Sequence, residues 1–223
     1  METARTIVLI LHIMAGFTAL VVGLIPFVAR KGSKLHRVTG WIFCYAMITV
    51  AFSAFGLAIY RFNPFLLMVG LFTLYTTVTG YRGLRFMRQP MAIGQVRDWA
   101  LFFLSIAGLA ITVWQTLVQF GTQSLSVPIL IGFFSLSLLN LLRLDALVFS
   151  RRKKMKRNAW VRYHIGRISG AYLATITAFL VTNVHTDPEF IAWLLPTVIG
   201  TPAIVYFQRQ YSDRKAKRVL SNA

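Results

Sequence analysis

Four histidines are the side chains of this chain best suited to hold a metal or a cofactor. His12 and His36 lie early in the sequence, and His164 and His185 lie late, each within or next to a long apolar stretch. Imidazoles from neighbouring helices are the usual axial ligands of a b-type haem, one on each side of the iron. The histidines therefore predict two ligand pairs, His12 with His185 and His36 with His164.

Two arginines next to the histidines strengthen this interpretation. Arg37 follows His36 directly, and Arg167 follows His164 by three residues, so either guanidinium could neutralise the propionates of a haem b. An alternative interpretation is structural, with the histidines bonded to loop carbonyls, lipid headgroups or a neighbouring helix. The 21 residues from His164 to His185 correspond to about 31 Å of helix, which would place two haems far apart.

A second group of polar residues lies within a single apolar stretch. Asn140, Arg143 and Asp145 follow one another closely there, and none of them is readily placed in lipid. Arg143 and Asp145 are two residues apart and point away from each other on a helix, so each needs another partner. Arg143 can reach the membrane surface, whereas Asp145 has a shorter side chain. Asn140 and Asp145 are therefore the candidate proton or cation site of a transporter.

The elements that must position these residues are membrane-spanning helices. Of the 223 residues, 57% are hydrophobic and 13% are charged, and the mean hydropathy is +0.64, which excludes a soluble globular domain. A helix of about 20 apolar residues spans the hydrocarbon core of a bilayer. The sequence contains seven such stretches: 6–29, 38–60, 64–81, 99–120, 127–149, 161–184 and 190–207. We therefore expect an all-α, seven-helix bundle over residues 1–208 and a basic cytoplasmic tail over 209–223.

Charge predicts how this bundle is oriented. The net charge is +18, and 22 of the 24 basic residues fall near alternate ends of the stretches, with only Arg5 and Arg61 on the other side. Basic residues near helix ends remain in the cytoplasm, so we expect the N-terminus outside and the C-terminus inside a cell inner membrane. Anionic lipid headgroups at the inner loops are then the expected partners, rather than nucleic acid. The sequence is also compatible with a homo-oligomer.

Small residues predict which helices pack together. Ala15, Gly16, Ala19 and Gly23 follow His12 on one face of the first helix, and Gly166 and Gly170 give a similar spacing in the sixth. We expect these two helices to be neighbours. In the seventh helix, Pro196 and Pro202 interrupt the backbone hydrogen bonds and predict a kink.

Several short motifs resemble those of a bacterial family of multi-pass membrane proteins, a domain of unknown function. The motifs are Leu11-His12-Ile13-Met14-Ala15-Gly16, Leu35-His36-Arg37 before Gly40, His164-Ile165-Gly166-Arg167 before Gly170, and Leu195-Pro196-Thr197 before Gly200-Thr201-Pro202. The resemblance implies an inner-membrane protein and supplies no activity. A looser likeness to two-haem b-type cytochromes rests on histidines sorted to the two sides of the membrane.

Three classes of function are compatible with these observations. The first is transmembrane electron transfer through haem b, with His12, His36, His164 and His185 as axial ligands. The second is transport of a small molecule, an ion or protons, using Asn140 and Asp145. The third is a scaffold or sensor without catalytic activity. Enzymatic activity stays open, although the sequence contains no phosphate-binding loop, nucleophile elbow or HExxH motif.

Overall fold

The computed structural model describes residues 2–60, 63–121 and 124–220, and for 211–220 it describes only the backbone. Over these ranges the chain is all-α, with seven long helices, one short 3-10 helix (η1) and no strand. The elements are α1 Glu2–Val28, α2 Lys34–Tyr60, α3 Pro64–Arg88, η1 Pro90–Ala92, α4 Val96–Val118, α5 Ser126–Phe149, α6 Arg157–Asn183 and α7 Phe190–Leu220.

All seven described helices are long and apolar enough to cross a membrane, as the sequence predicts. This length and composition are those of a multi-pass membrane protein. Several helices continue past the apolar stretches, because backbone hydrogen bonding continues where the side chains become charged. The third helix reaches Arg88 rather than position 81, and the seventh continues through Pro196 and Pro202 to Leu220. Most of the predicted basic tail thus extends α7.

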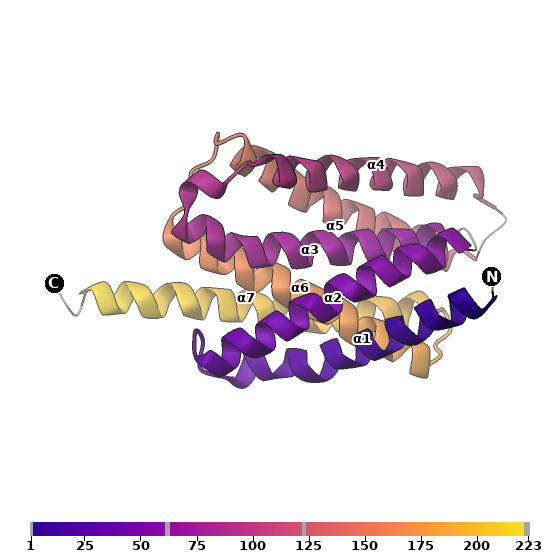
Figure 1. Cartoon of the computed structure of the whole chain (residues 1–223), viewed down its shortest axis with the longest axis horizontal. Coiled ribbons are helices and arrows are strands. Elements are labelled where there is room, and N and C mark those ends of the chain that lie inside the picture. The colour runs from indigo at the N-terminus through magenta and orange to yellow at the C-terminus, as the bar shows by residue number, and fades with distance from the viewer. Residues whose placement is uncertain (1, 61–62, 122–123, 221–223) are drawn as a thin grey trace.

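The basic turns all lie at one end of the bundle (Figure 1). The α1–α2 turn, the α3–α4 connection, the α5–α6 connection and the C-terminal end of α7 meet there, and the N-terminus lies at the opposite end. The charge pattern of the sequence therefore corresponds to a real separation in space. We call this the basic end of the bundle.

The third and sixth helices pack together in the interior. Two glycines of α3 allow α6 to approach closely: a Cβ atom at Gly80 would lie 2.9 Å from Arg167 Cβ, and one at Gly83 would lie 2.7 Å from Tyr163 Cδ1. Tyr75 of α3 is fully buried, as are most of the threonines in the same helix. A buried α3 rich in hydroxyl groups thus faces α6, where the polar side chains of the bundle interior meet.

The prediction that the first and sixth helices are neighbours is confirmed. The Tyr172 hydroxyl donates a hydrogen bond to the Leu20 carbonyl at 3.1 Å, and the Tyr172 ring packs against Phe27. Ala19 and Gly23 are buried at this contact, whereas Gly16 has no side-chain neighbour that a Cβ atom would meet. Of the small residues on this face of α1, only those nearest the basic end therefore pack against α6.

Candidate functional site

A buried ion pair between Asp145 of α5 and Arg167 of α6 lies in the interior of the bundle. The distance from Arg167 Nη2 to Asp145 Oδ1 is 2.8 Å, and the side chains are 3% and 0% exposed, respectively. Neither charge has access to water at these exposures. Removing two charges from water costs several kcal/mol per ion, and this cost is offset only when the pair is close and its other hydrogen bonds are satisfied.

Two tyrosines and a threonine complete the hydrogen bonding of this pair. The Tyr75 hydroxyl donates to Asp145 Oδ2 at 2.6 Å, and the Tyr163 hydroxyl donates to Asp145 Oδ1 at 2.9 Å. Arg167 Nη1 donates to Thr79 Oγ1 at 2.7 Å. The carboxylate thus accepts three hydrogen bonds, all from donors on α3 and α6. We call these five residues the buried polar cluster.

The guanidinium of Arg167 also lies against the faces of both tyrosine rings. Its Cζ atom is 4.1 Å from the centre of the Tyr163 ring and 5.4 Å from that of Tyr75. Cation–π contacts of this kind are strongest where the charge has lost its water shell. The two aromatic rings therefore help to fix the position of the Arg167 guanidinium.

A second buried ion pair lies nearer the basic end and has a different role. Arg82 of α3 donates from Nε to Asp98 Oδ1 at 2.6 Å, and Asp98 Oδ2 accepts from the backbone N–H of Gln95. Gln95 and Asp98 form a capping box at the start of α4. This pair therefore joins α3 to the start of α4.

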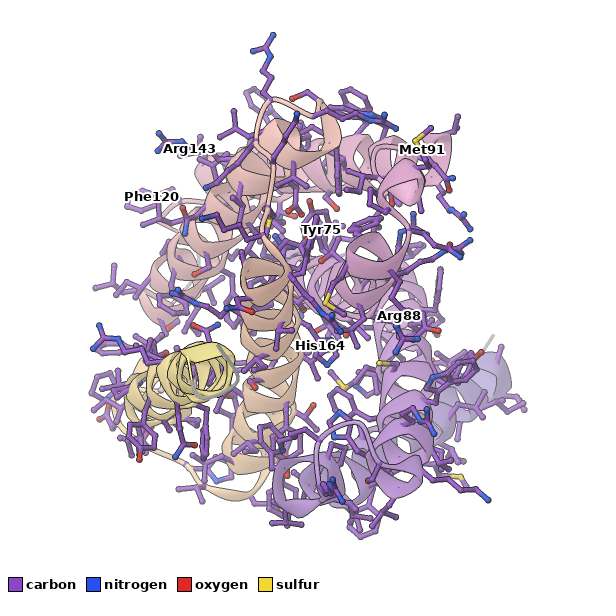
Figure 2. The ribbon with its side chains drawn as sticks, turned by 90° about the vertical axis from the view of Figure 1, so that its left-hand side faces the viewer. Tyr75, Arg88, Met91, Phe120, Arg143 and His164 are labelled. Atoms are coloured by element: carbon purple, nitrogen blue, oxygen red, sulfur yellow. The ribbon has the colours of Figure 1, made fainter. Side chains whose placement is uncertain are left out.

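His36 and His164 both lie near the basic end, at the starts of α2 and α6. Each donates its Nδ1–H to a backbone carbonyl, His36 to Pro26 at 3.2 Å and His164 to Gly80 at 2.9 Å. A carbonyl can only accept, so in the neutral ring Nε2 keeps its lone pair. Figure 2 places His164 in the interior of the bundle.

The other residues singled out from the sequence lie apart from this interior. His12 Nδ1 lies 2.8 Å from Ser53 Oγ of α2. His185 is exposed in the connection between α6 and α7, beyond the end of α6 at Asn183. Asn140 and Arg143 are both exposed, and Figure 2 places Arg143 at the periphery of the bundle. Asn140 is therefore separated from the buried carboxylate of Asp145.

Of the two arginines expected beside a haem, Arg37 is exposed, whereas Arg167 is the ion-pair partner of Asp145. Within the described ranges, His, Cys, Asp and Glu side chains form no group of three that could hold a metal ion. The role of Arg167 and the hydrogen bonds of Tyr75 and Tyr163 were not foreseen from the sequence. The only feature of the sequence that could have indicated these three residues is that a charged group and two hydroxyl groups lie within apolar stretches.

The buried polar cluster combines two chemically different groups. A carboxylate such as that of Asp145 is a base, and a guanidinium such as that of Arg167 has the planar fork of donors that matches carboxylate and phosphate oxygens. Comparison with known proteins adds no assignment, since the chain matches no protein-family model, no curated protein and no solved structure. The function must therefore be inferred from the geometry of this cluster.

Proposed function

We propose that this protein is a proton-coupled transporter of a small anion, with Asp145 and Arg167 as the exchange centre. The observation that carries the proposal is the fully buried carboxylate–guanidinium pair at the contact of α3, α5 and α6. Ionisable side chains buried in membrane-spanning helices commonly mark ion and proton pathways. This proposal develops the transport function expected from Asp145 and replaces Asn140 with Arg167.

The coupling follows from the cost of an unpaired charge. Arg167 keeps its proton at any physiological pH, so in the dry interior it always needs a negative partner. In the resting state that partner is Asp145. If an anion takes this place, Asp145 has lost its counter-ion and takes up a proton from the medium to become a neutral carboxylic acid. The net charge of the site is unchanged, so one monovalent anion binds with one proton.

The tyrosines support both states of the carboxyl group. In the resting state Tyr75 and Tyr163 donate hydrogen bonds to the carboxylate. After protonation, a carboxylic acid can still accept one of these bonds and donate its own proton to a hydroxyl oxygen. The cation–π contacts to both rings keep the guanidinium in position during the exchange. Both states therefore avoid a buried polar atom without a partner.

We further infer that the basic end of the bundle faces the cytoplasm of the cell inner membrane. Its turns carry the chain's excess of Lys and Arg, and such turns are retained on the cytoplasmic side. The N-terminus would then lie outside. Anions arriving from the cytoplasm would meet a positive field before they reach the helices.

Anion-driven proton movement tests the proposed function. The purified protein is reconstituted into vesicles that contain a pH-sensitive dye, and an inward gradient of chloride, nitrate or lactate is imposed at a clamped membrane potential. We expect acidification inside the vesicles with at least one of these anions, and none with Asp145→Asn. Asp98→Asn is the matched control, because it removes a carboxylate from the other buried ion pair.

Two results would contradict the proposal. One is a failure of all three gradients to move protons through the wild-type protein. The other is undiminished acidification in Asp145→Asn vesicles, which would show that the carboxylate is not the proton-binding group. Folding of each variant is checked by its elution as a single detergent-solubilised species.

One observation favours electron transfer through haem b as a second candidate. The Nδ1–H groups of His36 and His164 are both bonded to backbone carbonyls, which orients the rings as in metal-binding histidines and leaves Nε2 for a ligand bond. An absorption spectrum of protein expressed with haem supplied tests this proposal. A Soret band that sharpens on reduction and is lost in His36→Ala would support it, and a colourless wild-type preparation would reject it.

A further inference from the structure

A cavity of about 670 Å³ opens at the basic end, where α3 and α5 end and α6 begins. It lies between the α3–α4 and α5–α6 connections and is separate from the buried polar cluster. Phe86, Val148 and Trp160, all buried, form its floor. Because it lies where three spans reach the membrane surface, its mouth is at the depth of the lipid headgroups.

Five cationic side chains line this cavity and lack an acidic counterpart. No Asp or Glu is among the lining residues, and none of the ion pairs between described side chains involves these cations. The five are Arg88, Arg151, Lys153, Lys154 and Arg157, and all are exposed. Like charges gathered around one cavity repel each other, so an anion bound between them is strongly favoured.

The start of α6 adds to the positive field of the cavity. Arg157 is the first residue of α6, and Lys156 before it makes no side-chain cap hydrogen bond. A helix N-terminus carries a partial positive charge and unbonded N–H groups, and a basic residue there is unfavourable unless an anion is bound. By contrast, the start of α4 is already satisfied by Asp98.

Backbone geometry fixes the two connections that enclose the cavity. Arg151 has φ = 59°, in the left-handed region that costs an ordinary side chain roughly 1–2 kcal/mol. Gly94 has φ = 70° and lies so close to the Phe149 carbonyl that no side chain would fit. The Arg151 guanidinium donates to the Ile93 carbonyl at 3.5 Å, so this side chain links the two connections.

The cavity also has an apolar wall. Met87, Met91 and Met155 line it alongside the aromatic floor, and Met91 is 76% exposed. Figure 2 shows Met91 at the edge of the bundle. Flexible methionines adapt to irregular apolar ligands such as acyl chains. A soluble anion would use the cations alone, whereas a lipid would use both the cations and this wall.

We propose that this cavity binds an anionic phospholipid from the leaflet at the basic end. Its phosphate lies among the five cations, and the start of its acyl chains lies against the methionines. Basic pockets between spans at the cytoplasmic surface are suited to such headgroups. The number of cations favours a lipid with two phosphates, such as cardiolipin, over one with a single phosphate. This site is independent of the proposed transport function.

Native mass spectrometry of the full-length, delipidated protein in detergent tests the proposal. Cardiolipin, phosphatidylglycerol and phosphatidylcholine are titrated separately, and the fraction of protein with one bound lipid is measured. We expect cardiolipin to bind most tightly and phosphatidylcholine at least about tenfold more weakly, since each basic residue near an anionic surface contributes on the order of 1 kcal/mol.

Two matched triple variants locate the bound lipid. Arg88→Gln with Lys153→Gln and Lys154→Gln removes three cations of the cavity, whereas Arg30→Gln with Lys34→Gln and Arg209→Gln removes three exposed cations elsewhere in the described chain. We expect the first variant to bind cardiolipin at least about tenfold more weakly and the second to change binding less than twofold. If the first variant does not fold, the double variant Arg88→Gln with Lys154→Gln replaces it.

Other outcomes would overturn the proposal. An equal loss in both triple variants would mean that the lipid follows surface charge and does not occupy the cavity. Equal binding of phosphatidylcholine would exclude recognition of the headgroup charge. Displacement of cardiolipin by inorganic pyrophosphate at the same concentration as the lipid would identify a soluble anion as the ligand, since pyrophosphate has the phosphates without acyl chains.

Discussion

Replacing Asp145 by Asn should destabilise the bundle far more than the small chemical change suggests. Asn has the same shape, so no cavity forms, but the negative charge that faces Arg167 Nη2 at 2.8 Å is lost. Removing one partner of a buried ion pair typically lowers the free energy of unfolding by about 3–5 kcal/mol. A side-chain hydrogen bond in a membrane protein contributes less than this, about 0.6 kcal/mol on average. Most of the loss therefore comes from leaving the Arg167 guanidinium buried without a counter-ion. We predict a loss of about 3 kcal/mol.

Equilibrium unfolding in mixed SDS micelles measures this free energy. The chain contains five tryptophans, so tryptophan fluorescence follows unfolding of the whole bundle, and one of them, Trp160, packs against the Tyr163 ring at 5.4 Å between centres. Adding Arg167→Met to Asp145→Asn removes the stranded charge and should recover at least about 1 kcal/mol. An Asp145→Asn protein within about 1 kcal/mol of wild type would refute the reasoning, because the carboxyl group could not then be the obligatory counter-ion.

The remaining predictions concern packing and topology. Tyr163→Phe should lower the free energy of unfolding by about 1–2 kcal/mol in the same titration, more than an average hydrogen bond in a membrane protein, because the acceptor that loses its donor is a buried, charged carboxylate. No change would mean that this bond contributes nothing. Gly83→Ala should lower the free energy of unfolding by about 1–3 kcal/mol, because the added methyl group displaces the Tyr163 ring. Gly40→Ala, with open space around it, should be neutral or slightly stabilising. Equal effects of the two substitutions would reject the close approach of α3 and α6. In a cysteine-free background of intact cells, Asp187→Cys should react with a membrane-impermeant maleimide and Lys153→Cys should not; the reverse pattern would invert the proposed orientation.

The number and position of the helices could be predicted from the sequence because the bilayer imposes them. Any stretch of about 20 apolar residues must form a spanning helix, and the turns between such stretches carry the charge. The ends of the helices were harder to place. Arg82, Arg85 and Arg88 continue α3 well past the apolar stretch, since a helix ends by its own capping interactions rather than at the membrane surface.

The pairing of side chains across helices could not be predicted. Asp145 was identified as needing a partner, but helical spacing limits a sequence argument to residues three or four apart on one helix. Its partner Arg167 lies 22 residues away on α6, and Tyr75 lies 70 residues away on α3. Only the close packing permitted by Gly80 and Gly83 brings these side chains together, and that packing is a property of the folded bundle.

Infrared difference spectroscopy of the carboxyl group tests the proposed exchange at Asp145 most directly. The purified protein is exposed to the transported anion at constant pH, and the spectrum before binding is subtracted. We expect the loss of a carboxylate band and the gain of a protonated carboxyl band, both absent in Asp145→Asn and both present in Asp98→Asn. Anion binding without any protonated carboxyl band, or with the band retained in Asp145→Asn, would contradict it.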